Sequence, residues 1–101
     1  MFQLKQTETY QKWDRALKER RARALIAARL LRLVNGHMGD APSVGKGVRE
    51  LSIHYGPGYR IYFQQRGSDI VLLLIGGDKS TQTRDIAAAK QLAAEWSDED
   101  D

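Results

Sequence analysis

Hydrophobic positions in the first third of the chain follow the period of a strand and then that of two helices. Phe2 to Lys5 alternates between apolar and polar residues and predicts a short strand. Apolar residues then recur every three or four positions, as they do on one face of a helix. They predict one helix capped by Thr7 or Thr9 and running to about Lys18, and a second over residues 20–34 that ends at an Asn–Gly pair. These elements form a helical hairpin.

The period changes after a loop over residues 37–47 that is rich in glycine and proline. Alternation over residues 48–53 and 59–65 predicts two strands joined by a tight turn. The uniformly apolar run over residues 70–75 predicts a third strand, covered on both faces. A Gly–Gly pair then breaks the strand, and an alanine-rich helix is predicted over residues 85–96.

This order of elements predicts an α+β two-layer domain with helices on one sheet face. It contains an N-terminal strand, a helical hairpin, a three-stranded antiparallel meander and a C-terminal helix. A chain of 101 residues fits a single domain, here residues 1–96. Residues 97–101 form an acidic tail that we predict to be mobile.

Composition narrows the class of protein. The chain has no cysteine, which excludes a disulfide framework and a thiolate nucleophile, and it has no apolar run long enough to span a membrane. We therefore expect a cytoplasmic protein with no membrane contact. Thirteen acidic side chains less the four of the tail leave nine against sixteen basic ones, a net charge of +7 for residues 1–96. Such a surface favours polyanions or an acidic protein partner, although a solvated helix face has the same pattern.

Three side chains around the meander could act on a phosphodiester. Arg60 lies in the middle of a predicted strand, Lys79 follows the last strand, and His54 lies beside the first turn. Arginine and lysine stabilise charge on phosphate, and histidine exchanges protons near neutral pH. The set suits cleavage by an RNA 2′-hydroxyl, with no cofactor and no metal. Taken singly, each residue has an ordinary alternative: a solvated or ion-paired arginine, a turn lysine and a surface histidine.

The candidate RNA contacts are Arg49, Tyr59, Tyr62 and Arg84. The two tyrosines flank Arg60, and their rings could stack on unpaired bases. Arg49 precedes the meander turn and falls on the opposite strand face from His54. Two isolated histidines without carboxylates at ligand spacing argue against a metal site.

Several sequence blocks carry a family pattern: Glu-Leu-Ser-Ile at 50–53, Gly-Pro-Gly-Tyr-Arg-Ile-Tyr-Phe at 56–63, Leu-Leu-Leu-Ile-Gly-Gly-Asp-Lys-Ser at 72–80, Thr-Tyr-Gln-Lys-Trp at 9–13, and the basic segment 21–36. Through them, residues 2–96 resemble the RelE/ParE superfamily of type II toxin–antitoxin toxins, in the HigB-like branch of addiction-module killer proteins. The resemblance implies a small α+β fold with a curved antiparallel sheet.

The resemblance also implies a metal-independent endoribonuclease that cleaves mRNA in the ribosomal A site. Arg60 would hold the scissile phosphate and Lys79 would stabilise charge on it, while His54 or a tyrosine would transfer protons. The implied partners are a cognate antitoxin, within a toxin–antitoxin hetero-oligomer, and mRNA on the ribosome with its rRNA. ParE-like members share the scaffold but inhibit DNA gyrase by binding without cleavage. That alternative, and a module that only binds its antitoxin, remain open because a fold does not determine a function.

Overall fold

A five-stranded mixed sheet forms the middle of the molecule in the computed structural model, which describes residues 1–97. The strands lie in the order β1-β5-β4-β3-β2, with β1 parallel to β5 and the other neighbouring pairs antiparallel. In chain order the elements are β1 (Gln3–Gln6), α1 (Glu8–Ala16), α2 (Arg20–Val34), β2 (Ser43–Gly45), β3 (Val48–Ile53), β4 (Tyr59–Arg66), β5 (Ile70–Asp78), the 3-10 helix η1 (Lys79–Thr81) and α3 (Gln82–Glu95). The α+β class is confirmed.

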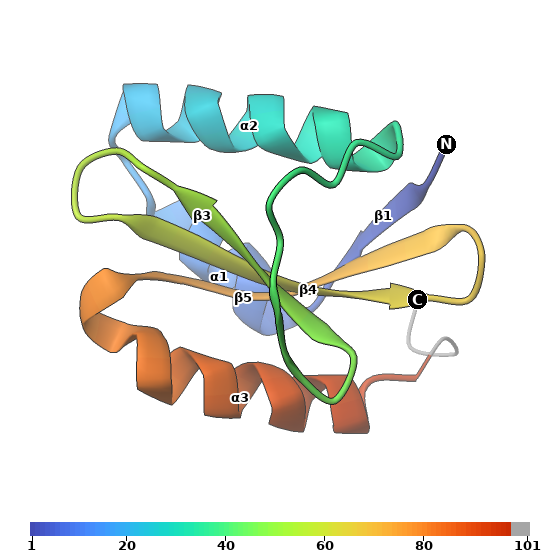
Figure 1. The fold of residues 1–101 in the computed structure, drawn as a ribbon. Coiled ribbons are helices and arrows are strands. Elements are labelled where there is room, and N and C mark those ends of the chain that lie inside the picture. The colour runs from blue at the N-terminus through green and yellow to red at the C-terminus, as the bar shows by residue number, and fades with distance from the viewer. Residues whose placement is uncertain (98–101) are drawn as a thin grey trace.

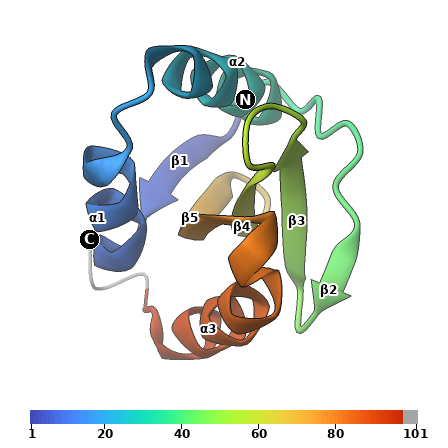
Figure 2. The same ribbon diagram turned by 90° about the vertical axis from the view of Figure 1, so that its left-hand side faces the viewer.

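Helices cover both faces of the sheet, with α1 and α2 on one face and α3 on the other (Figures 1 and 2). The two-layer prediction is therefore wrong. Val71 and Leu73 of β5 join the core beneath α1 and α2, whereas Leu72 and Leu74 join the core against α3. The apolar run of β5 was correctly interpreted as a strand covered on both faces. The two-layer prediction failed because it placed all the helices on one face.

The Gly76–Gly77 pair does not break the last strand as predicted, and β5 continues to Asp78. A Cβ atom added at Gly76 would collide with the indole of Trp13, and one added at Gly77 would collide with the carboxylate of Asp85. Glycine is therefore needed for close packing of a helix on each face.

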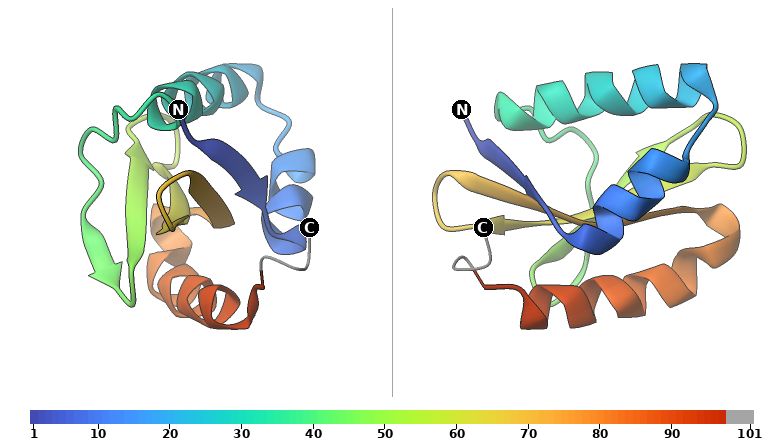
Figure 3. Two further views of the ribbon diagram at one scale, coloured as in Figure 1. Left: turned by 90° about the vertical axis from the view of Figure 1, so that its right-hand side faces the viewer. Right: turned by 180° about the vertical axis from the view of Figure 1, so that it is seen from behind.

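The connection between α2 and β2 passes along the β3 edge of the sheet, from the α2 layer towards α3 (Figure 3). We predicted only a loop over residues 37–47, but Ser43–Gly45 forms β2 and pairs with β3. Three residues of edge strand are too few to show a period in the sequence. This short strand places the β2–β3 turn beside α3.

The remaining boundaries are close to the predicted ones. Thr7 caps α1, because its Oγ1 accepts a hydrogen bond of 3.0 Å from the backbone N–H of Tyr10. The last helix begins at Gln82 rather than Asp85, directly after η1. Apart from Ser97, the predicted acidic tail lies outside the described residues. Within residues 1–97, no helix has the length and apolarity to cross a membrane.

Candidate active site

A shallow depression of about 430 Å³ lies where the β3–β4 turn meets the end of β5. His54, Arg60 and Lys79 all line it, together with the Tyr-Gly-Pro-Gly turn at residues 55–58. These three side chains come from the end of β3, from β4 and from η1. The fold thus brings together the three residues that the sequence nominated for catalysis.

Arg60 is held in a defined orientation. Its side chain is 12% exposed, and Nη1 donates a hydrogen bond of 2.9 Å to the carbonyl of Gly58. Nε lies 3.7 Å from Oε1 of Glu50, which is an ion pair but too long for a hydrogen bond. The guanidinium is therefore fixed at one end by the turn and faces a carboxylate at the other.

Gly58 lets Arg60 and Lys79 approach the same point. Its φ of +79° is in the left-handed region, where glycine has no steric penalty. A Cβ atom at this position would lie 3.3 Å from Arg60 Nη1 and 3.4 Å from Lys79 Cβ. The turn backbone therefore lies against both cationic side chains.

Glu50 forms a buried polar cluster behind Arg60. Its Oε2 accepts hydrogen bonds from the hydroxyl of Tyr62 at 3.0 Å and from Nε2 of Gln82 at 2.8 Å. Glu50 is only 7% exposed, so these donors and Arg60 compensate a carboxylate removed from water. The cluster joins β3, β4 and α3 and ends at the guanidinium. Sequence reasoning missed Glu50 and Gln82; the signal for Glu50 was its shared strand face with Ser52 and His54.

Tyr62 is not an RNA contact, contrary to the prediction. It lies on the same strand face as Arg60, but α3 covers it and it is fully buried. Burial raises the pKa of its hydroxyl, and the hydrogen bond to Glu50 raises that pKa further. The strand alternation was correct, but the face assigned to solvent is covered by a helix.

Lys79 occupies the first position of η1, whose geometry is set by Asp78. The Asp78 side chain accepts hydrogen bonds from the backbone and the hydroxyl of Ser80, and these bonds lower the pKa of the carboxyl. Lys79 and His54 are both exposed. Among the described residues neither side chain has a hydrogen bond or an ion pair, so both are available to a ligand.

Arg84 lies next to this depression rather than in it. A second hollow of about 530 Å³ is lined by residues 79–84 and shares Lys79 with the first. The Arg84 side chain is 77% exposed, and its Nε lies 3.5 Å from the buried carboxylate of Asp85. Arg84 therefore extends the positive surface along the beginning of α3.

Arg49 and Tyr59 do not line the depression. The ring of Tyr59 packs edge-on against Trp13, with 6.4 Å between ring centroids, in the core beneath α1 and α2. Arg49 donates a hydrogen bond of 2.9 Å to the carbonyl of Ala41 and is paired with Phe63 of β4. Both residues thus belong to the opposite sheet face from Arg60, as strand alternation requires.

Among the described residues that line the depression, His54 is the only histidine, the side chain type best suited to exchange protons near neutral pH. Tyr55 also lines it, but its hydroxyl donates a hydrogen bond of 2.9 Å to Glu19. That bond raises the pKa of Tyr55 and keeps its proton in place. In the described part of the chain, no three histidine, cysteine, aspartate or glutamate side chains gather as metal ligands would.

No protein-family model matches the chain. The chain is 50% identical over 94 residues to a protein of Haemophilus influenzae that is described as uncharacterized. The alignment covers 93% of this chain and 95% of the Haemophilus protein. The similarity thus extends over nearly the full length of both proteins.

Proposed function

We propose that this chain, which belongs to one family with the Haemophilus influenzae protein, is the toxin of a type II toxin–antitoxin pair. It acts in the cytoplasm as a ribosome-dependent mRNA endoribonuclease and thereby blocks translation. The observation that carries this proposal is the convergence of Arg60, Lys79 and His54 on one depression. The resemblance of the meander to the RelE/ParE superfamily, in its HigB-like branch, supports the same activity.

The depression supplies the groups that phosphodiester cleavage requires. The RNA 2′-oxygen bonds to phosphorus as the bond to the 5′-oxygen breaks, which yields a 2′,3′-cyclic phosphate and a 5′-hydroxyl. Arg60 and Lys79 bind the phosphate oxygens and stabilise the charge that accumulates on them. His54 either takes the proton of the 2′-hydroxyl or gives one to the 5′-oxygen. Because His54 is exposed, solvent water carries out the other of these two proton transfers.

Glu50 serves the proposed reaction through Arg60. A buried carboxylate beside Nε partly offsets the arginine charge and keeps the guanidinium from moving. The other end of the guanidinium is bonded to the turn, so the group is already oriented before a phosphate arrives. Glu50 is therefore a positioning residue and not a catalytic one.

The proposed partners follow from charge as well as from resemblance. An acidic segment of the cognate antitoxin would cover part of the positive surface in a hetero-oligomer, and rRNA phosphates would contact it on the ribosome. Both contacts should weaken steeply with salt.

Induction of the chain without its antitoxin, followed by mapping of mRNA 5′ ends, tests the activity. We expect new ends within translated codons, and about a 100-fold or greater loss of them in Arg60→Ala. Lys79→Ala and His54→Ala should also lose activity, and both residues are exposed, so the fold is retained. Lys18→Ala and His37→Ala are matched controls at exposed positions away from the depression.

Two outcomes would contradict the proposal. Growth arrest with intact mRNA, above all with DNA damage, would favour a ParE-like gyrase inhibitor that binds without cleavage. Full toxicity of a stably folded Arg60→Ala variant would show that Arg60 is not part of the active site.

A further inference from the structure

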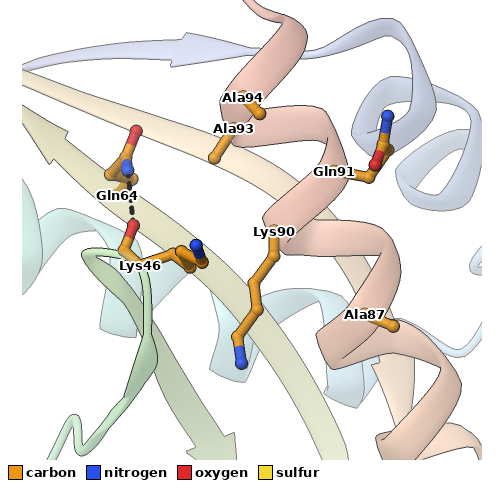
Figure 4. A pocket seen from close by; sticks show the side chains of 7 residues that line it. All are labelled: Lys46, Gln64, Ala87, Lys90, Gln91, Ala93 and Ala94. Carbon is orange, nitrogen blue, oxygen red and sulfur yellow. Dashed lines mark hydrogen bonds between the residues drawn. The ribbon is translucent and has the colours of Figure 1, made fainter.

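A separate groove, of about 470 Å³, lies between the β2–β3 turn and the exposed side of α3 (Figure 4). Two lysines and two glutamines line it, Lys46, Lys90, Gln64 and Gln91, together with three alanines of α3. Lys46 extends from the turn towards the helix, and Lys90 extends from the helix back towards the turn (Figure 4). None of these residues belongs to the depression around Arg60.

The β2–β3 turn holds Lys46 in place. Lys46 has a φ of +57°, and glycines with positive φ lie on both sides of it. A non-glycine residue in this conformation persists only where its surroundings hold it. Here Nε2 of Gln64 donates a hydrogen bond of 3.0 Å to the Lys46 carbonyl and ties the turn to β4.

Lys90 reaches the same turn from α3. Its Nζ lies 3.0 Å from the place that a Cβ atom of Gly45 would occupy, so the ammonium lies close against the turn backbone. Lys90 is half-buried. The helix and the turn thus direct two positive charges into one concave space.

In the part of the chain that the structure describes, no carboxylate lines this groove. Within residues 1–97, neither Lys46 nor Lys90 forms an ion pair. Two like charges that share a concave site repel each other unless an anion lies between them. The groove is therefore complementary to a phosphate or a carboxylate.

The groove and the depression both have lining residues on the α3 side of β4. Gln64 and Arg60 are four residues apart on the α3 side of β4, about 13 Å at the rise of a strand. Lys79 and Arg84 continue the row of cations at the beginning of α3. Cations spaced along one face match the repeated charge of a nucleic-acid backbone better than the irregular charges of a peptide. The alanine lining offers no aromatic ring for a base, so the contact is to the backbone.

We propose that the groove between Lys46 and Lys90 binds a backbone phosphate of the single-stranded RNA whose scissile phosphate lies at Arg60. This inference rests on the proposed function and adds a second, sequence-independent contact along the same strand. Its role is to align the RNA along the edge of α3 and not to take part in the cleavage.

A charge-matched pair of double variants tests the groove. Lys46→Gln with Lys90→Gln removes the two groove charges, and Lys12→Gln with Lys18→Gln removes two exposed charges elsewhere. The probe is a ten-nucleotide 2′-O-methyl oligouridine, which has no free 2′-hydroxyl and cannot be cleaved. Binding measured by fluorescence anisotropy over a range of salt gives the slope of log K against log salt concentration.

We expect the groove variant to bind several-fold more weakly and its salt slope to be smaller by about 1. The control variant should keep most of the wild-type slope. If the two double variants lost affinity and salt slope equally, net charge alone would explain the effect, and the inference would be overturned. So would a wild-type chain that binds an oligoglutamate peptide in preference to the oligonucleotide, or that binds neither probe.

The two proposals can fail separately. If wild type cleaves mRNA and the groove variant keeps the wild-type slope, the groove inference fails and the proposed function stands. If wild type leaves mRNA intact while the groove variant loses slope, the phosphate contact stands and the endoribonuclease assignment fails.

Discussion

The two faces of the sheet bury different kinds of side chain. The core beneath α1 and α2 is large and almost wholly apolar, with Leu33, Ile61 and Phe63 among its fully buried members. The core against α3 is smaller and borders the carboxylates of Glu50 and Asp85, both buried. The face beneath α1 and α2 provides most of the apolar burial, whereas the face against α3 also buries charged side chains away from water.

Tyr10 and Tyr62 show this difference directly, because both are almost completely buried, Tyr10 beneath α1 and α2 and Tyr62 against α3. The hydroxyl of Tyr10, in the core beneath α1 and α2, has no hydrogen-bond partner among the described residues. The hydroxyl of Tyr62, against α3, donates to Glu50. The Tyr10 hydroxyl is thus buried without a described partner on the first face. On the second face the Tyr62 hydroxyl binds Glu50 and helps to hold that carboxylate beside Arg60.

Phe63→Ala should have the largest effect on stability. It removes a fully buried ring from the core beneath α1 and α2, and such truncations cost about 3–5 kcal/mol. Urea unfolding monitored by circular dichroism measures the loss. A loss below about 1 kcal/mol would show that this face is not the main source of stability.

Glu50→Ala should lower both stability and activity. It leaves Arg60 without its carboxylate and removes the acceptor of Tyr62 and Gln82, at a cost of about 3 kcal/mol. Glu50→Gln keeps an accepting oxygen and should be milder in stability while still losing mRNA cleavage. Wild-type cleavage by a folded Glu50→Gln variant would contradict the positioning role.

Tyr62→Phe and Tyr10→Phe remove the same atom from the two faces. We expect Tyr62→Phe to cost about 2 kcal/mol, because a hydrogen bond to a carboxylate is lost. Tyr10→Phe should lower stability by less than about 0.5 kcal/mol or raise it slightly. The reason is that the Tyr10 hydroxyl has no hydrogen-bond partner among the described residues. If chemical unfolding gave the same loss of stability for both variants, the proposed difference between the two faces would be contradicted.

Alkaline pH should lower stability through both faces. Burial raises the pKa of Tyr10 and Tyr62 above the ordinary value of 10.0, so both hydroxyls bind their protons more tightly in the folded state. The stability from this difference is fully present below pH 10.0 and is lost as pH rises above it. Melting temperatures between neutral and strongly alkaline pH measure the decline, which should be shallower in Tyr62→Phe.

Local patterns predicted much of the fold. The helices, the strand meander and the turn at residues 55–58 follow from hydrophobic period and from glycine and proline placement. The same patterns failed at Gly76–Gly77, where glycine serves close packing rather than a strand end. They also failed at β2, whose three residues form a strand only because β3 lies beside them.

The candidate site was predictable in part. Arg60 was nominated as an arginine in the middle of a strand, and Lys79 and His54 were nominated by their positions after a strand and beside a turn. The strand order then places the three together. Tyr62 was misassigned because alternation tells which face a residue occupies but not whether a helix covers that face. The groove between Lys46 and Lys90 joins residues far apart in the chain and left no local signal.

The sequence by itself determined most of the secondary structure, the excess of positive charge and the side chains able to act on a phosphate, because these depend on residue type and near neighbours. The tertiary structure decided which polar groups are buried and which are open. Docking α3 across the sheet buries Tyr62 and Glu50 behind Arg60, yet leaves Lys79 and His54 exposed at its beginning. Whether a side chain is buried depends on which element packs against it in space. The residue pattern of one segment therefore cannot predict burial.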